Sequence, residues 1–287
     1  MRWTRSYKSS AGVSPANPRN KTGGTPVLLR LGLAMLTVVI VAAALAGVLA
    51  KHGPTEQPYR DQALAAPSPE HWLGVDGVGR DVTTRMLYGA RATLGIALGA
   101  TAIAVLAGTV LGAAAGILRG WFDAVVSHVT DFLLAFPTIL LGLVTLTVLP
   151  PSPVSVTVAV GIASWPTVVR QVSAAFVSEG AKEYVLSARA AGAGRWRIAA
   201  REILPNCVAL ILVLTTLTLG GAVLESAGLA FLGLSGQPDV PEWGMMLRDE
   251  RSTLRIAPWL CVAPGLAITW TVLAFNLLSD GLRQRWR

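Results

Sequence analysis

Long uncharged hydrophobic runs, separated by short polar segments, dominate the chain. The runs 31–50, 92–118 and 256–279 each reach the roughly 20 residues that an α-helix needs to cross a bilayer. The run 132–169 is too long for one span, and the prolines of its "LPPSP" stretch predict a tight turn between two helices. A further run extends from Cys207 to just before Glu225. The pattern predicts an all-α polytopic membrane protein with six transmembrane helices.

Glycines recur in the second predicted span at helical spacing. They stand at four-residue steps with one gap: Gly95, Gly99, Gly108, Gly112 and Gly116. Small residues at this interval let two helix backbones approach closely in a bilayer, so we expect tight packing of this span. The preceding stretch "DVTTRMLYGAR" is expected to form a separate short helix along the outer interface.

Composition agrees with a membrane protein. Of 287 residues, 53% are hydrophobic and 14% are charged, whereas soluble domains are about one quarter charged. The first hydrophobic run is longer than the apolar region of a signal peptide, which has about 7–15 residues. Residues 27–50 are therefore expected to be a retained first helix.

Positive charge gathers at both ends of the chain. Residues 1–26 are basic, lack acids and are rich in Ser, Pro, Asn and Gly, which predicts a disordered tail attracted to lipid headgroups. Arginines also end the chain, in residues 281–287. Because Lys and Arg collect on the cytoplasmic side, both termini are expected there as cytoplasmic tails. Segments 51–88 and 231–257 carry more acids than bases and are expected outside.

No motif for catalysis accompanies these helices. The chain has neither a GxxxxGK[ST] phosphate loop nor an HExxH pair, and its three histidines lack the spacing of metal ligands. Cys207 and Cys261 fall in different predicted spans, which disfavours a disulfide. The net charge of +8 lies largely in the tails and indicates a membrane surface rather than nucleic acid. We therefore expect no catalytic, cofactor or metal site in this chain and no nucleic-acid partner.

A polar insert, "LSARAAGAGRWRIAAREILPN" at 186–206, interrupts the hydrophobic pattern. Residues 178–191 and 195–203 each favour helix, and the "GAG" between them predicts an elbow. Pro205 is expected at the start of the fifth span, where its missing N–H costs little. Two short amphipathic helices on the cytoplasmic face follow from this pattern. By periodicity alone, an interfacial helix lying on lipid headgroups fits equally well.

This insert resembles the cytoplasmic EAA loop of ABC importer permeases, whose pattern is EAA, three residues, Gly, nine residues and I-x-L-P. Ala188, Gly192, Leu204 and Pro205 match in register, whereas Leu186, Ser187 and Glu202 depart from it. Other stretches are similar to the dipeptide, oligopeptide and nickel group of permeases: "LGVDGVGRDVTTRMLYGAR", "DFLLAFP", "ESAGLAFLGLSGQPDVPEWGMML" and "APWLCVAPGLAITWTVLAFNLLSDGLR". Together they cover residues 73–283 almost completely and most resemble the "C" permease of a dipeptide or oligopeptide importer.

The resemblance implies a type I ABC importer permease fold. Residues 89–280 would be its transmembrane domain of five helices, with a coupling loop at 176–206 and an outer loop at 231–257. The expected partners in the cell membrane are a homologous permease, two ATP-binding subunits that hold ATP and Mg, and an extracytoplasmic solute-binding protein. The implied substrate is a dipeptide or oligopeptide. Nickel, haem or another small solute is the alternative, and a stand-alone secondary transporter is disfavoured because neither internal repeats nor an ion relay is present.

The resemblance also assigns candidate residues for coupling to the ATPase. They are Glu183, Ala188, Gly192, Arg195, Trp196, Arg197, Ile198, Ala199, Arg201, Leu204 and Pro205. We expect Trp196, Ile198 and Ala199 to pack in a groove of the ATPase, while the arginines set the register.

Two further groups of candidates lie within and outside the spans. The intramembrane polar residues are Asp131, Arg170, Glu225 and Asn276. Asp131 and Arg170 are expected to pair or to snorkel, Glu225 to lie near the outer mouth and Asn276 to bond a neighbouring helix. The expected contacts of the binding protein are Asp76, Arg80, Asp81, Trp243, Met245 and Met246. The alternative for the outer loop is a plug that packs over its own bundle.

Overall fold

The structure, a computed structural model, describes residues 25–235 and 240–286. Residues 1–24, which make up most of the predicted basic tail, lie outside the described residues. In the described ranges every regular element is a helix, and one isolated bridge joins Val75 and Asp81. The long helices are α1 (Thr25–Ala44), α3 (Val82–Leu118), α6 (Pro153–Glu179), α9 (Leu204–Phe231) and α11 (Trp259–Arg285). The short ones are α2 (Ala46–Leu49), η1 (Arg60–Gln62), α4 (Trp121–Leu134), α5 (Thr138–Val148), α7 (Glu183–Ala190), α8 (Arg195–Ile198), η2 (Ala199–Ile203), α10 (Trp243–Asp249) and η3 (Arg251–Thr253).

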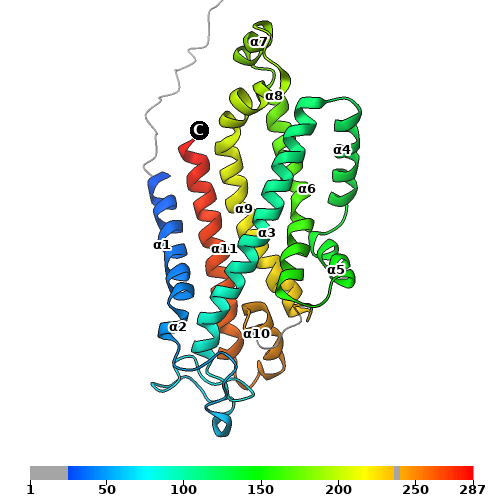
Figure 1. The fold of residues 1–287 in the computed structure, drawn as a ribbon. Helices are drawn as coiled ribbons and strands as arrows, with labels where there is room; N and C mark the ends of the chain where they lie inside the picture. The colour runs from blue at the N-terminus through cyan, green and yellow to red at the C-terminus, as the bar shows by residue number, and fades with distance from the viewer. Residues whose placement is uncertain (1–24, 236–239, 287) are drawn as a thin grey trace, which may run out of the picture.

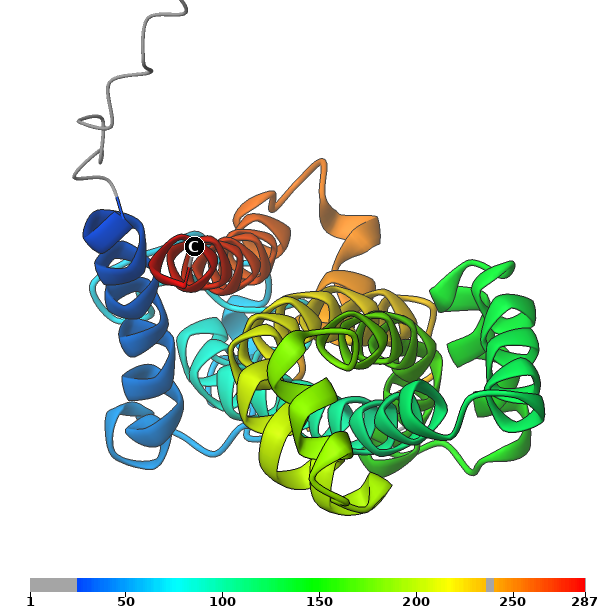
Figure 2. The same ribbon diagram turned by 90° about the horizontal axis from the view of Figure 1, so that it is seen from above.

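The long helices stand side by side as a bundle with two different ends (Figures 1 and 2). The start of α1, the C-terminus, α7 and α8 lie at one end, which we call the α7–α8 end. The α2 helix, the segment before α3, and α10 lie at the opposite end, which we call the α10 end.

Several helices are suited to cross a membrane. Four stretches are long and apolar enough to do so: Val27–Ala44, Val82–Leu118, Arg195–Phe231 and Trp259–Arg285. The bent pair of α4 and α5 makes a fifth candidate. These candidate spans confirm the prediction of an all-helical polytopic membrane protein. The α6 helix has 27 residues, about 40 Å, and packs along α3 more extensively than any other helix pair.

The third predicted span is not one helix. The α4 and α5 helices meet at 96°, and the chain breaks at residues 135–137. Pro137 has no N–H to donate, and its ring disfavours helical backbone in the preceding residue, which favours a break at this position. The predicted turn at "LPPSP" is confirmed, because α5 ends at Val148 and Ser152 caps the start of α6, where its Oγ accepts a hydrogen bond from Ser155 N at 3.0 Å.

The stretch "DVTTRMLYGAR" is also corrected, because it forms the first turns of α3 rather than a separate interfacial helix. Asp81 caps α3, and its Oδ2 accepts hydrogen bonds from Thr84 N at 2.8 Å and Thr84 Oγ1 at 2.7 Å. After this cap no proline interrupts the helix before Leu118.

Glycines bring α3 and α6 into close contact, as predicted. A Cβ at Gly108 would lie 2.6 Å from Val168 Cβ, and one at Gly116 would lie 2.7 Å from Phe176 Cβ. A Cβ at Gly112 would lie 2.7 Å from the carbonyl oxygen of Val169. These positions have no room for a larger side chain, so the backbones of α3 and α6 meet directly.

The α1 helix is attached to the bundle through α11 and α3. Trp270 Nε1 of α11 donates a hydrogen bond to the Met35 carbonyl at 3.1 Å. Arg91 of α3 donates to the carbonyls of Ala43 and Ala44 at 3.1 and 3.2 Å, which satisfies groups left free where α1 ends. The first span therefore belongs to the same packed body.

Candidate functional site

The polar insert forms a bent projection at the α7–α8 end. The α7 helix stops in a Schellman arrangement, in which Ala193 N donates to Ala188 O at 3.0 Å and Gly192 N donates to Arg189 O at 2.9 Å. Gly192 has a φ of +81°, a conformation that favours glycine. The predicted elbow is confirmed, and it sets the angle between α7 and α8.

The second half of the insert is continuous with the following span. Residues Arg195–Phe231 form one helical stretch that includes α8, η2 and α9. Pro205 lies at the start of α9, as predicted, although α8 and η2 run into this helix without a break. The turn before it, Ala199–Ile203, is π-helical, a wider form that relieves the clash of the proline ring with the preceding turn. Any displacement of α8 thus acts directly on α9.

The insert has a buried face and an exposed face. Ile198 is 3% and Ala199 6% exposed, and both pack in a hydrophobic cluster of this chain with Phe176 and Val185. This corrects the expectation that Ile198 and Ala199 pack against another protein. Trp196 is 63% exposed. The remaining coupling candidates are also accessible: Glu183, Gly192, Arg195, Arg197, Arg201 and Pro205 are exposed, and Ala188 and Leu204 are half-buried.

A small polar network, absent from the sequence-based candidates, holds the insert to the bundle. Tyr184 Oη donates to Glu179 Oε2 at 2.9 Å, and Asn206 Nδ2 donates to Tyr184 Oη at 3.2 Å. Burial and the adjacent Glu179 carboxylate raise the pKa of Tyr184 to about 12. Lys182 Nζ donates to the other Glu179 oxygen at 2.6 Å. The network joins α7 to the end of α6 and the start of α9. Tyr184 and Asn206 both lie within the predicted coupling loop 176–206, but their pairing depends on the folded elbow.

The intramembrane candidates separate into a pair, a cavity residue and an exposed residue. Arg170 of α6 pairs with Asp131 in the last turn of α4, and both side chains are more than half exposed. Glu225 of α9 lies at a cavity of about 190 Å³ between α5, α6 and α9. Asn276 is exposed in α11 and makes none of the hydrogen bonds found among the described residues, so its predicted bond to a neighbouring helix is not confirmed.

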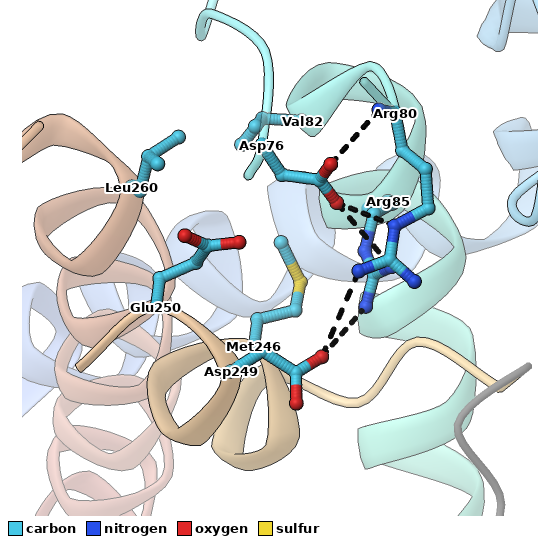
Figure 3. A pocket seen from close by; sticks show the side chains of 8 residues that line it. All are labelled: Asp76, Arg80, Val82, Arg85, Met246, Asp249, Glu250 and Leu260. Carbon is cyan, nitrogen blue, oxygen red and sulfur yellow. Dashed lines mark hydrogen bonds and ion pairs between the residues drawn. The ribbon is translucent and has the colours of Figure 1, made fainter. Parts of the chain in front are cut away.

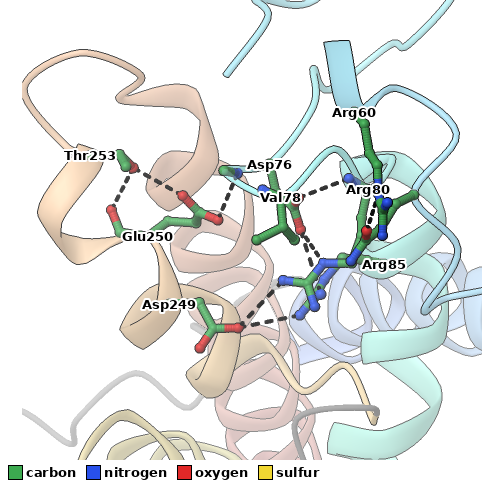
Figure 4. Close-up of polar contacts among 10 residues, drawn as sticks. Arg60, Asp76, Val78, Arg80, Arg85, Asp249, Glu250 and Thr253 are labelled. Atoms are coloured by element: carbon green, nitrogen blue, oxygen red, sulfur yellow. Dashed lines mark hydrogen bonds and ion pairs between the residues drawn. The ribbon is translucent and has the colours of Figure 1, made fainter. Parts of the chain in front are cut away.

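The α10 end contains an ionic cluster, shown in Figures 3 and 4, in which Asp76, Arg85 and Glu250 are buried and Asp249 is exposed. Arg85 of α3 lies 3.5 Å from Asp76 and 3.5 Å from Asp249 of α10, and Arg80 contacts both carboxylates. Glu250 accepts a hydrogen bond from Gly77 N at 3.2 Å. These residues enclose a cavity of about 10 Å³, which is room for about one water molecule. The cluster therefore joins the segment before α3 to α10 rather than forming a ligand site.

The six residues expected to contact a binding protein are largely internal. Asp76, Asp81, Trp243, Met245 and Met246 are each at most 6% exposed, and Arg80 is half-buried. Trp243 Nε1 donates to the Met86 carbonyl at 3.1 Å, and Gly244 lies against the α9 backbone at Ala227. The described part of the outer loop thus packs as a plug over its own bundle, and the expectation that these six residues form the external contact is corrected. A charged residue in a sequence suggests an exposed position, but the side chains of Asp76 and Arg80 form an ion pair with each other inside the protein.

Glu242 lies buried where α10 begins. Burial raises the pKa of its carboxyl to about 8, so this side chain is mostly protonated at neutral pH.

Among the described residues no group of three His, Cys, Asp or Glu side chains is arranged to hold a metal ion.

A packed helical bundle with several long apolar helices, a polar insert continuous with one of them, and a plug at the opposite end are the features of a multi-pass membrane protein. Residues 108–286 match the family described as "Binding-protein-dependent transport system inner membrane component", and the chain belongs to this family. It is therefore a multi-pass inner membrane protein and the non-catalytic permease subunit of an ABC transporter. Family membership implies a paired permease, an ATPase and a binding protein.

Named relatives narrow this class. Dipeptide transport system permease protein DppC of Alkalihalophilus pseudofirmus is 40% identical over 271 residues, covering 94% of this chain and 89% of that protein. Glutathione transport system permease protein GsiD of Pectobacterium atrosepticum is 42% identical over 223 residues, covering 78% and 74%. Di/tripeptide transport system permease protein DppC of Pseudomonas aeruginosa is 38% identical over 258 residues, covering 88% and 85%. The chain is similar to permeases of peptide and glutathione importers.

Proposed function

We propose that this chain forms, with a homologous permease, the transmembrane pathway of an ATP-driven importer of di- or tripeptides. Relatives named for dipeptides and di/tripeptides match 88–94% of this chain, whereas the glutathione relative matches 78%. Glutathione, itself a tripeptide, is the second candidate because that relative is equally similar where it aligns. Two ATPase subunits and a solute-binding protein complete the proposed transporter.

The proposed topology has six passes and both termini in the cytoplasm. The bent pair of α4 and α5 and the long α6 join the four clear spans to give this number. The start of α1, the C-terminus and the polar insert lie at one end of the bundle (Figure 1). Basic residues flank both termini, which supports a cytoplasmic α7–α8 end. The α10 end then faces outward, where exposed Trp72 and Ile256 are candidates for contact with the binding protein.

The observation that carries the proposal is the continuity of α8 with α9. This chain has no phosphate loop, so work from ATP must reach it through contacts. Moving a two-state equilibrium from 1:99 to 99:1 requires about 5.5 kcal/mol of differential interaction. A helix that begins with exposed Trp196 at the insert and continues to Phe231 is a direct route for such work. The proposed contact face comprises Trp196, Arg195, Arg197 and Arg201, together with Glu183, while Gly192 and Pro205 set its geometry.

The matched pair Trp196→Ala and Trp121→Ala tests this face. Both tryptophans are exposed near the α7–α8 end, at 63% and 78%, but Trp121 lies on α4, outside the insert. Because an exposed tryptophan anchor contributes about 2 kcal/mol or more to an interface, Trp196→Ala should weaken ATPase retention about 30-fold. Trp121→Ala should leave retention unchanged.

The assay is co-purification of the ATPase subunits, followed by ATP-dependent uptake of a labelled dipeptide into proteoliposomes with the binding protein. Excess unlabelled tripeptide should compete for uptake more strongly than glutathione. Normal retention and uptake in Trp196→Ala would refute the proposed coupling face. Stronger competition by glutathione would transfer the substrate assignment to the second candidate.

A further inference from the structure

A carboxylate without a positive partner lies inside the bundle. Glu225 Oε2 of α9 accepts a hydrogen bond from Ser164 Oγ of α6 at 3.2 Å. Among the residues that the structure describes, no basic side chain lies within ion-pair distance of Glu225. Arg170, also on α6, is paired with Asp131 instead. The charge of Glu225 therefore has no counter-charge within the described chain.

The cavity next to Glu225 is lined by polar groups from three helices. It measures about 190 Å³, and its polar side chains are Thr138, Ser164, Thr167, Gln171, Thr218 and Glu225. On α9 the lining residues recur one helical turn apart, and those of α6 do the same, so each helix presents a stripe to the cavity. The polar members are Thr218 and Glu225 on α9, and Ser164, Thr167 and Gln171 on α6. Such a stripe inside a bundle of otherwise apolar helices is not explained by packing.

The chemistry of these groups favours a small organic cation. A charged side chain within the membrane costs about 3 kcal/mol by insertion scales, so acids there are paired or functional. An ammonium group has three donors and no acceptor. The Glu225 carboxylate and the threonine hydroxyls all offer acceptors, so together they can replace the water around an ammonium group.

We propose that Glu225, with Ser164 and the threonines of this cavity, is a subsite for the ammonium group of the peptide in transit. The inference rests on the proposed function and deepens it. Dipeptides, tripeptides and glutathione each carry an α-ammonium group, so the subsite recognises what these substrates share. The cavity is smaller than the about 300–1,000 Å³ that holds a complete drug-sized ligand, and it therefore accommodates one end of a peptide.

Gly221 provides a reporter position in the same cavity. It lies one helical turn before Glu225, and a Cβ placed there would meet no atom within 4 Å. Gly221→Cys should therefore fold, in a background in which Cys207 and Cys261 are replaced by alanine. The assembled transporter, with both permeases and the ATPases, is treated in detergent with a trimethylammonium or a sulfonate thiosulfonate reagent. The ratio of the two rates measures the local charge.

With Glu225 intact, the cationic reagent should react faster relative to a free thiol standard, and Glu225→Gln should lower the cation-to-anion ratio about tenfold. Asp61→Asn, which changes an exposed acid at the α10 end, should leave the ratio unchanged. Leu217→Cys, in the same cavity lining but outside the proposed subsite, provides a second reporter if the first variant assembles poorly.

A measurement with added dipeptide distinguishes substrate binding from a purely electrostatic effect of Glu225 on the modification rate. Millimolar dipeptide with a free amino group should slow cysteine modification several-fold, whereas its N-acetyl derivative should not, and Glu225→Gln should abolish the protection. A ratio unaffected by Glu225→Gln would overturn the proposal, and would show that a basic residue of the paired permease or a proton neutralises the carboxylate. Absence of protection by dipeptide would overturn it as well. Neither readout requires ATP-driven uptake, so failure of the proposed function would be seen separately.

Discussion

Replacing Gly112 with alanine tests whether the contact between α3 and α6 sets the rigidity of the bundle. A Cβ at this position would lie 2.7 Å from Val169 O, 3.0 Å from Val172 Cβ and 3.1 Å from Ser173 N. Two of these three atoms belong to the α6 backbone and cannot rotate away. Restoring a contact of 3.4 Å to the carbonyl requires a separation of about 0.7 Å, from 3.4 minus 2.7. A gap of that size loses about a quarter to a half of each dispersion contact that it opens.

Two opposing contributions decide whether Gly112→Ala raises or lowers the free energy of unfolding. Alanine is favoured over glycine in a helix interior by about 1 kcal/mol, whereas overpacking of a close contact costs about 1–3 kcal/mol. Because α3 and α6 pack along most of their length, the strain cannot be confined to one side chain, and we expect a net loss of about 1–2 kcal/mol.

Gly95→Ala is the matched control on the same helix. A Cβ at Gly95 meets no atom within 4 Å, so only the propensity term applies and the variant should be neutral or more stable by up to about 1 kcal/mol. Thermal unfolding of the purified complex in detergent should separate the two variants by about 2–5 °C. Equal midpoints for Gly112→Ala and Gly95→Ala would show that α3 and α6 adjust freely, which would refute the reasoning.

Two other features give predictions of the same kind. Arg85→Met should destabilise the complex by about 3 kcal/mol, because it leaves the buried carboxylate of Asp76 with Arg80 alone and removes one partner of the exposed Asp249, and it should expose the segment before α3 to limited proteolysis. Arg60→Met, at an exposed arginine, is its control, and equal protease resistance of the two would contradict the ionic cluster. Gly192→Ala should strain the elbow by about 1–2 kcal/mol and reduce the peptide transported per ATP, whereas Gly194→Ala, at a φ of −69°, should not. Unchanged coupling in Gly192→Ala would show that the angle between α7 and α8 does not matter.

The hydrophobic runs, the glycine spacing and the elbow were predictable because each depends on local chain properties. The 96° bend at Pro137 was not, since proline alone does not end a helix in a bundle. Pro166 and Pro264 lie inside α6 and α11, which continue past them. Whether neighbouring groups satisfy the freed carbonyls is decided by packing, which the sequence does not display.

The candidate site was misread where long-range pairing decides burial. Asp76 looks like an exposed acid in the sequence, but it is buried beside Arg85, which also pairs with Asp249, a residue far away in the sequence. In the polar insert, periodicity identified amphipathic helices but not which protein covers the apolar face. Ile198 is buried in this chain because it packs in the cluster with Phe176 of α6 and Val185 of α7, a long-range contact that the spacing does not reveal.

The α9 helix links the features that matter for transport. It continues the polar insert at one end, forms a wall of the Glu225 cavity, and meets Gly244 of the plug through Ala227. About 45 Å of helix separates Arg195 from Glu225, and the π-helical turn at residues 199–203 is the one departure from α-helix within that length. The α3–α6 contact, by contrast, is too close to slide without strain. On the proposed function, a push at Trp196 therefore moves the Glu225 stripe relative to the Ser164 stripe, which couples ammonium binding in the cavity to the state of the ATPase.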